Sequence, residues 1–184
     1  MDYSKFPKDL PIPEDDGACN HLINSHLPDI SLPNQDGNLL KLNRIDTFRI
    51  VLYFFSMTGR PDRPIPNNWK NIPGAMGCTP QTCSIRDSYD KLVNLNAVPI
   101  GVSTQSVEDL KEMSIRLLIP YDLLSDINLK LQNSLNLPIF SIDEKIYIKR
   151  LTLVIEKSVI KKVFYPIFPP HKHINEVVEW LKIN

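Results

Sequence analysis

Residues 73–87 read PGAMGCTPQTCSIRD and hold two of the chain's three cysteines, Cys78 and Cys83. They follow a Pro-rich loop and the very apolar run at residues 50–55, and they lead into residues 78–95, where apolar side chains recur at helical spacing. A cysteine at the start of a helix meets the positive end of the helix dipole and free backbone N–H groups, which both favour the thiolate. The thiolate is the nucleophile, so the stretch indicates thiol-based redox chemistry with Cys78 as nucleophile and Cys83 as its partner.

The segments around this stretch alternate between strands and helices. Residues 50–55 and 98–103 are short, continuous and apolar, which predicts two strands in the middle of a sheet. The other expected elements are a hairpin (27–32 with 39–42), helices at 106–118, 128–136 and 173–183, and strands at 121–124, 145–155 and 159–165. This order predicts an α/β fold: a thioredoxin-like sandwich with a central mixed sheet, an N-terminal β-hairpin and flanking helices.

The bulk composition is that of an ordinary globular protein. With 184 residues, 42% apolar and 23% charged, the chain is most simply one folded domain, residues 27–184, preceded by a Pro-broken arm, residues 1–26. The 21 basic and 21 acidic residues cancel, which argues against nucleic acid or an anionic membrane as a partner. No apolar run is long enough to span a membrane and the first residues lack the apolar core of a signal peptide. A cytoplasmic location is therefore expected, where paired cysteines are more often catalytic or metal-binding than disulfide-bonded.

The spacing of the two cysteines leaves three interpretations open. On one continuous helix, residues five positions apart have Cα atoms about 8.5 Å apart, whereas a disulfide needs about 7 Å or less. Cys78 and Cys83 therefore pair only if the first helical turns unwind, as redox exchange would require. They could instead be two ordinary helix residues, or half of a metal site with His171 and His173. The metal site is the least favoured, because the sequence has no second close ligand pair of the usual kind. The two histidines, just after Pro169-Pro170, are expected to face solvent.

Residues 77–87 read Gly-Cys-Thr-x-x-x-Cys-Ser-Ile-Arg-Asp. This motif resembles the signature Gly-Cys-Thr-x-x-x-Cys-x-Phe-Arg-Asp of the Q-type peroxiredoxins, also known as bacterioferritin-comigratory-protein-like peroxiredoxins. Further similarities follow in the family's order at residues 51–55, 101–104, 123–126 and 149–155. Together they cover about residues 27–183. The resemblance includes a loop inserted ahead of the active-site cysteine.

This resemblance implies a thioredoxin-dependent peroxidase acting on hydrogen peroxide or organic hydroperoxides. Cys78 would be the peroxidatic cysteine, Cys83 would resolve its sulfenic acid, and Arg150 would stabilise the thiolate and polarise the peroxide. A thioredoxin- or glutaredoxin-like protein would reduce the resulting disulfide. We expect no cofactor and no metal, and a monomer or a homodimer.

The chain departs from the family motif just before the nucleophile. The motif has a proline seven residues and a threonine or serine three residues ahead of the cysteine, where this chain has Asn71 and Ala75. Thr58 could supply the missing hydroxyl if most of residues 59–76 are an insertion, although it could also be an ordinary loop threonine. The same departures support an alternative function: a redox-sensing or thiol–disulfide exchange module with weak peroxidase turnover.

The remaining conspicuous residues have structural explanations as well. Arg86 and Asp87 are expected to form a solvated ion pair on the helix. Trp69 either lines the substrate entrance or anchors the long loop. Cys19 lies outside the matched region and is expected to be non-catalytic, and residues 164–170 either pack over the sheet edge or form a dimer contact.

Overall fold

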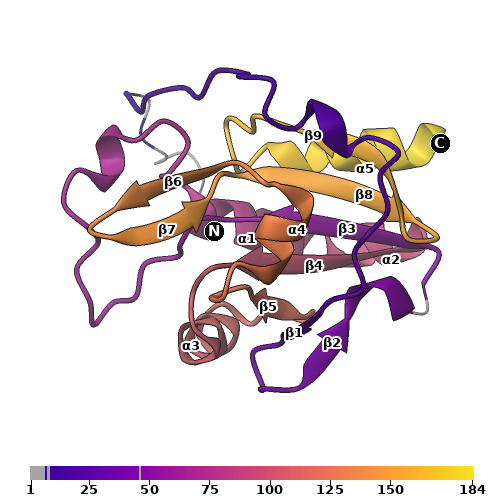
Figure 1. Ribbon diagram of the computed structural model, residues 1–184, viewed down its shortest axis with the longest axis horizontal. Coiled ribbons are helices and arrows are strands. Elements are labelled where there is room, and N and C mark those ends of the chain that lie inside the picture. The colour runs from indigo at the N-terminus through magenta and orange to yellow at the C-terminus, as the bar shows by residue number, and fades with distance from the viewer. Residues whose placement is uncertain (1–6, 8, 46) are drawn as a thin grey trace.

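A mixed sheet forms the centre of the molecule (Figure 1). The computed structural model describes residues 7, 9–45 and 47–184, so residues 1–6 and 8 of the predicted arm lie outside the described residues. Within them, the sheet has the strand order β5-β4-β3-β8-β9. Its strands are β3 (Arg49–Phe54), β4 (Ala97–Ser103), β5 (Leu123–Ser125), β8 (Leu151–Glu156) and β9 (Val159–Phe164). Strands β3, β4 and β5 are parallel and β8 and β9 are antiparallel to their neighbours, which confirms the predicted α/β fold with a central mixed sheet.

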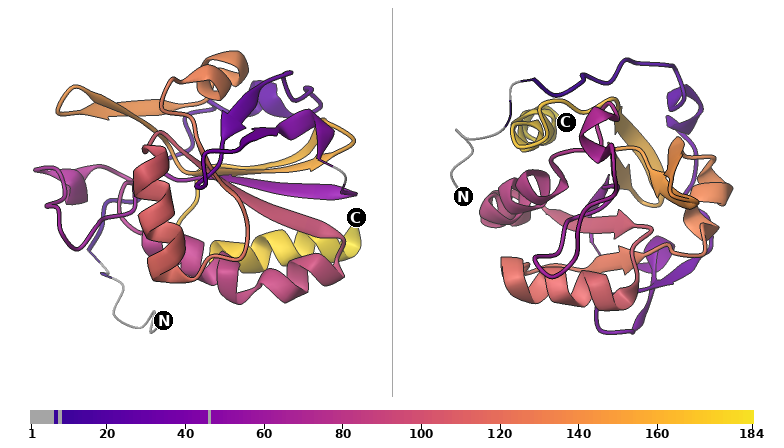
Figure 2. Two further views of the ribbon diagram at one scale, coloured as in Figure 1. Left: turned by 90° about the horizontal axis from the view of Figure 1, so that it is seen from below. Right: turned by 90° about the vertical axis from the view of Figure 1, so that its left-hand side faces the viewer.

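Different elements cover the two faces of this sheet (Figure 2). The helices on one face are α1 (Cys78–Asp87), α2 (Tyr89–Asn94), α3 (Val107–Leu117) and α5 (His173–Ile183). The other face carries the hairpin β1 (Ser31–Pro33) with β2 (Leu39–Lys41), the 3-10 turns η2 (Asn20–Leu22) and η3 (Leu42–Arg44), and α4 (Lys130–Leu135). Of the described helices, none is long and apolar enough to cross a membrane.

The buried strand β3 shows why its sequence is continuously apolar. Val51 and Tyr53 pack into the core under the helices, whereas Leu52 and Phe54 pack into the core on the hairpin side. Successive side chains of a strand point to opposite faces, so a strand covered on both sides is apolar through its middle, and the one charged residue of β3, Arg49, stands at its start. In β4, Gly101 allows close packing, because a Cβ there would come within 2.7 Å of the Tyr53 hydroxyl.

The predicted strand at residues 145–155 is wrong, because the chain breaks in its middle. Its first part is β7 (Lys145–Ile148), which pairs with β6 (Ile139–Ile142) in a separate hairpin that was not predicted. The backbone N–H of Lys149 then bonds to the Pro138 carbonyl, and Arg150 stands between β7 and β8. This hairpin packs on the long loop that contains η4 (Trp69–Asn71), so Arg150 lies where the hairpin, the loop and the central sheet meet.

The helix boundaries are partly as predicted. The segment expected as one helix, residues 78–95, is two helices separated by Ser88, whose N–H closes a tighter turn onto the Ile85 carbonyl. The predicted cap of α3 is confirmed, since the Ser106 side chain accepts a hydrogen bond from the Asp109 N–H. Helix α5 begins and ends at the predicted residues, His173 and Ile183.

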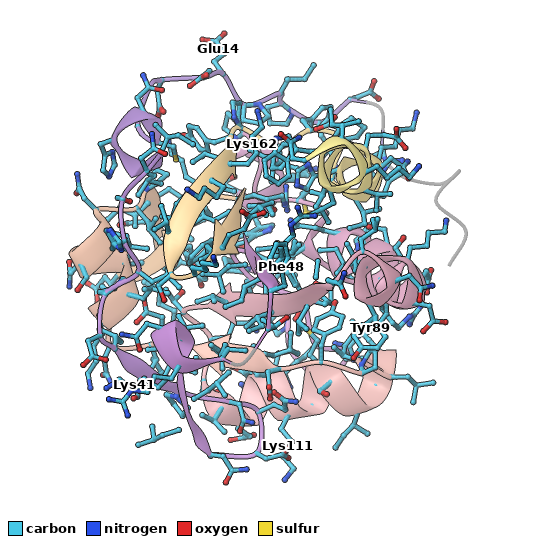
Figure 3. All side chains as sticks on the ribbon, turned by 90° about the vertical axis from the view of Figure 1, so that its right-hand side faces the viewer. Glu14, Lys41, Phe48, Tyr89, Lys111 and Lys162 are labelled. Atoms are coloured by element: carbon cyan, nitrogen blue, oxygen red, sulfur yellow. The ribbon has the colours of Figure 1, made fainter. Side chains whose placement is uncertain are left out.

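The described part of the N-terminal arm is packed against the body of the protein. Cys19 and Leu22 are buried in the hairpin-side core, and the Asn24 N–H bonds to the Ile160 carbonyl of β9. Glu14, which precedes these residues in the chain, is exposed and points away from the body of the protein (Figure 3). The arm runs along the outside of the molecule, across the top in Figure 1, while its last residues join the core. The predicted domain boundary at residue 26 stays a prediction.

Candidate active site

Cys78 is the first residue of α1, as the sequence predicted. Gly77 ahead of it has φ of 103°, a left-handed conformation that glycine adopts without steric cost. Pro80 lies in the first helical turn, where its missing N–H removes no hydrogen bond. The Cys78 side chain is 2% exposed, and its thiol lies 3.6 Å from the Ala75 carbonyl, to which it donates. The sulfur thus lies at a helix N-terminus, where backbone N–H groups favour negative charge.

The structure brings Arg150 to this sulfur. The antiparallel register pairs Leu151 of β8 with Phe54 of β3, so Arg150 stands just beyond the end of β3, next to the start of α1. Its Nη2 lies 3.1 Å from Cys78 Sγ. A charged donor at this distance forms a stronger hydrogen bond to a thiolate than to a thiol.

Four hydrogen bonds fix the orientation of the Arg150 guanidinium. Besides the bond to the sulfur, Nη1 donates to the Gly74 carbonyl at 2.8 Å and Nη2 to the Met76 carbonyl at 3.1 Å. Nε donates to Gln81 Oε1 at 2.8 Å. The chain just ahead of Cys78 therefore wraps around the arginine, and both groups are positioned together.

Gln81 is a site residue that the sequence analysis missed. It is fully buried, and its Nε2 has no hydrogen-bond partner among the described residues. Residues three apart share one face of a helix, so its spacing from Cys78 was a usable signal. Gln81 links the helix that carries the nucleophile to the arginine that contacts it.

Cys83 lies on the same unbroken helix and is 1% exposed. All three cysteines are free thiols, so the structure shows the two helical cysteines unpaired. Cys83 packs in the helix-side core with Tyr53 and Tyr121, and burial raises the pKa of its thiol. The two cysteines thus have different environments: Cys78 contacts a guanidinium, and Cys83 is held neutral in an apolar layer.

Thr58 does not share this site's contacts. It is 1% exposed, its hydroxyl lies 2.7 Å from Met113 Sδ, and its N–H donates to Gln105 Oε1. No hydrogen bond joins Thr58 to Cys78 within the part of the chain that the structure describes. A catalytic role for Thr58 stays a prediction that these contacts do not support, and the buried methyl group of Ala75 stands where the family has a hydroxyl.

The expectation that both histidines face solvent is wrong for His173. It is 3% exposed, and its Nε2 lies 3.0 Å from Thr152 Oγ1 on β8. Burial, aided by the positive charge of Arg150, lowers the pKa of His173 to about 3. Across the described residues, no three His, Cys, Asp or Glu side chains gather as metal ligands would, so the alternative metal site with His171 is not assembled.

A cavity of about 450 Å³ opens beside Arg150. Its walls come from the loop ahead of α1, from Phe140 of β6, from residues 165–167 and from the N-terminal arm. Arg150 lines this cavity and also contacts Cys78, so it connects the cavity to the sulfur. A second cavity of about 460 Å³, near Gln105, includes none of the predicted site residues.

The other singled-out residues have structural roles. Trp69 is buried and packs on Phe140 and Tyr147, which makes it an anchor of the long loop. Arg86 pairs with Asp87 as predicted and also donates to the Leu117 carbonyl, which ties α1 to α3. Cys19 lies in the core on the opposite face of the sheet from Cys78, and burial raises its pKa to about 12.

Residues 164–170 lie beside the site, and their two predicted roles, packing over the sheet edge and a dimer contact, both stay predictions. Ile167 is buried, and Tyr165 to Ile167 line the cavity beside Arg150. Tyr165 also donates a hydrogen bond to Asp16 of the arm. The segment therefore belongs to the surroundings of the site.

Comparison with known proteins gives a consistent result. The family model described as Redoxin matches residues 23–180. A chloroplastic peroxiredoxin Q from Arabidopsis thaliana is 30% identical over 158 residues, which cover 84% of this chain and 64% of that protein. A chloroplastic peroxiredoxin Q from Sedum lineare is 29% identical over 158 residues, covering 84% of this chain and 75% of that protein. The chain thus spans less than two thirds of the length of the first of these relatives.

Solved structures share the fold. The crystal structure of peroxidoxin BcpB from Mycobacterium tuberculosis superposes with a TM-score of 0.72 at 22% identity, covering 88% of this chain and 96% of that one. A mutant PrxQ from Xylella fastidiosa superposes with a TM-score of 0.70 at 20% identity, covering 88% of this chain and 95% of that one. At these identities the similarity concerns the fold alone, and it confirms the predicted thioredoxin-like sandwich.

Proposed function

Because the chain belongs to the redoxin family, we propose that it is a thiol-dependent peroxidase that reduces hydrogen peroxide or organic hydroperoxides. The observation that carries this proposal is the 3.1 Å contact between Arg150 Nη2 and Cys78 Sγ at the start of a helix. The names of the peroxiredoxin Q relatives support it. Cys78 is the attacking residue in this proposal, because it is the cysteine at which the positive groups converge.

The first step oxidises Cys78. Its thiolate attacks the terminal oxygen of the peroxide, an S–O bond forms, and the O–O bond breaks. The leaving alkoxide or hydroxide takes a proton from solvent and departs as alcohol or water, and the sulfur, having lost two electrons, becomes a sulfenic acid. Arg150 stabilises the negative charge that develops on the peroxide oxygens, and its fixed orientation removes the cost of reorganising at that moment.

The second step pairs the two cysteines. The Cys83 sulfur attacks the sulfenic sulfur, an S–S bond forms, and water leaves with the Cys83 proton. On an intact helix the two Cα atoms are about 8.5 Å apart, which is too far for a disulfide. The first turns of α1 must therefore open. A thioredoxin- or glutaredoxin-like dithiol then reduces the disulfide and is itself oxidised.

Steady-state peroxide consumption with thioredoxin, thioredoxin reductase and NADPH tests the proposal. We expect continuous turnover by the wild type and none above background by Cys78→Ser. Cys19→Ser is the matched control, because it removes a buried cysteine from the opposite core, and it should keep wild-type turnover. Turnover that survives Cys78→Ser, or that is lost in Cys19→Ser, would contradict the proposal.

A second candidate function is a redox-sensing or thiol–disulfide exchange module with weak turnover. It is favoured by Ala75, which offers no hydroxyl next to Cys78, and by the nearly complete burial of both helical cysteines. Such a module would consume peroxide only slowly after its first oxidation, even with excess reductant. The same assay separates the two functions, since a peroxidase consumes many equivalents.

A further inference from the structure

The N-terminal arm forms part of the cavity beside Arg150. Ile12, Pro13, Glu14 and Asp16 all line it, together with the loop ahead of α1 and residues 165–167. The family match begins at residue 23, so these arm residues lie outside the matched region. They lie beside Arg150, which lines the same cavity and contacts the Cys78 sulfur.

Two contacts hold the arm against the site. The Asp16 carboxylate accepts hydrogen bonds from Lys149 Nζ at 2.8 Å and from the Tyr165 hydroxyl at 2.9 Å. Lys149 directly precedes Arg150, so this anchor is attached to the strand end that carries the arginine. Pro13 lies so close to Gly74 that a Cβ built on the glycine would be 3.4 Å from the proline ring.

The cavity offers an apolar surface next to a charged end. Ile12, Ile72, Phe140 and Ile167 contribute apolar side chains, and the paired charges of Asp16 and Lys149 neutralise each other at the rim. Its volume of about 450 Å³ falls within the range of about 300–1,000 Å³ typical of pockets for drug-sized organic molecules. Hydrogen peroxide is far smaller and would leave most of it empty.

We propose that the arm residues Ile12, Pro13, Glu14 and Asp16 form the outer wall of the peroxide pocket and determine its selectivity. They would hold the organic part of a bulky apolar hydroperoxide while its peroxide group lies at Arg150. This inference rests on the proposed peroxidase function. Contact with the wall stabilises only a substrate that has an organic part. Loosening the arm therefore affects bulky hydroperoxides and leaves hydrogen peroxide largely unaffected.

Point variants with matched controls test this wall. Asp16→Ala releases the anchor, and Asp29→Ala is its control, because Asp29 makes an equivalent pair of bonds with Lys41 and Asn43 away from the cavity. Ile12→Ser removes an apolar wall residue that is 66% exposed, and Ile115→Ser removes one that is 67% exposed on α3.

For both arm variants we expect kcat/KM with cumene hydroperoxide to fall about fourfold, the effect of losing the apolar contact of roughly one methylene group. With hydrogen peroxide it should stay within about twofold of wild type, and the two controls should match wild type with both peroxides. Equal losses with both peroxides, no loss with either, or faster turnover of cumene hydroperoxide would overturn the proposal.

A binding measurement makes the test independent of turnover. Cumyl alcohol, the reduced product, is titrated into the reduced full-length protein and followed by NMR. We expect shifts in residues 12–16 and 165–167, and weaker binding to Asp16→Ala but not to Asp29→Ala. If peroxides are consumed but these residues do not shift, the wall is refuted and the peroxidase function stands. If the residues shift but no peroxide is consumed, the pocket stands and the proposed function fails.

Discussion

At the scale of single residues, the site depends on how one guanidinium group is held. Arg150 contacts the Cys78 sulfur with one nitrogen, while the carbonyls of Gly74 and Met76 and the side chain of Gln81 hold the others. Hydrogen bonds from a fixed guanidinium are directional, so its orientation decides whether its donors point to the place where charge develops. The groups that bind the guanidinium therefore influence the reaction at the Cys78 sulfur without contacting it.

Gln81 is the partner whose contribution is most easily measured. In Gln81→Met, Nε of Arg150 loses its buried acceptor, and we expect kcat/KM for hydrogen peroxide to fall about tenfold, the effect of one lost hydrogen bond to a charged group. Gln81→Glu keeps an oxygen acceptor at the same place and should recover most of the loss. Initial rates across peroxide concentrations would measure both.

The separate kinetic constants distinguish positioning from simple destabilisation. If Gln81 orients Arg150, Gln81→Met should lower kcat more than it raises KM, and Gln81→Glu should return kcat toward wild type. A Met variant with wild-type kinetics would show that the other three bonds suffice to hold the arginine.

At the scale of elements, helix α1 must serve two states. It carries both cysteines in one continuous helix in the reduced protein, and burial raises the pKa of Cys83 and keeps it neutral there. A disulfide between them is incompatible with that helix geometry. The start of α1, held by the contacts of Arg150, is therefore the element expected to change during turnover.

Hydrogen exchange tests this opening. In the Cys78–Cys83 disulfide form we expect the backbone amides of residues 78–83 to exchange faster than in the reduced protein, because their helical hydrogen bonds are broken. Helix α3, which contains no cysteine, serves as the internal control and should keep its protection. Unchanged protection of α1 in protein shown by mass to be fully disulfide-bonded would contradict the account.

The elements also show what the sequence could predict. Strand β3, the Ser106 cap and helix α5 were predictable because a local apolar pattern or a local hydrogen bond defines each. The β6–β7 hairpin was not, because it packs on Trp69, which is far away in the sequence. The prediction of one long strand at residues 145–155 was wrong for the same reason. The break in the strand at Arg150 depends on the hydrogen bond from the Lys149 N–H to the Pro138 carbonyl, which lies in another segment.

At the scale of the whole molecule, the site lies at one end of the central sheet, where the helix-side core meets the small cluster around Trp69. The helix-side core contains Cys78 and Cys83, the hairpin-side core contains Cys19, and the central sheet separates them. Helix α5 closes the first core, and its initial residue, His173, is buried against Thr152 close to Arg150. A proton on this histidine would be a buried positive charge beside another one, so the folded state requires neutral imidazole.

Stability should therefore fall as the solution becomes acidic. The pKa of His173 is about 3 in the folded state, against an ordinary value of 6.5, so the unfolded chain binds this proton first. The full contribution is present above about pH 6.5 and declines toward pH 3, by at most about 1.4 kcal/mol per pH unit. Glu176 faces the other ring nitrogen at 3.4 Å, but its side chain is 65% exposed, so water screens its opposing effect.

Urea unfolding at pH 7 and pH 5 measures this decline. Wild type should lose roughly 2 kcal/mol more than His173→Gln, which cannot titrate but can still bond to Thr152. Equal losses in the two proteins would mean that His173 takes up its proton without cost in the folded state.

Only some of the site residues could be predicted from the sequence, because others depend on contacts between distant parts of the chain. Cys78 and Cys83 were found from their place at the start of a helix, Arg150 was found because the family resemblance carries it, and the structure brings Arg150 to Cys78. Thr58 was inferred by shifting the motif across an insertion, and the fold directs it toward Met113 instead. The arm could not be placed, because its bonds to Lys149 and Tyr165 join residues more than 130 positions apart. A cytoplasmic location likewise stays a prediction.

The central claim is that Cys78 is the residue that peroxide oxidises and that Cys83 then pairs with it. Mass spectrometry of the reduced protein after one equivalent of hydrogen peroxide, with peptide mapping, tests this directly. The account predicts a Cys78–Cys83 disulfide in the wild type, a sulfenic acid at Cys78 in Cys83→Ser, and no oxidation of Cys83 in Cys78→Ser at the same dose. Rapid oxidation of Cys83 in Cys78→Ser, or a wild-type disulfide that includes Cys19, would contradict it.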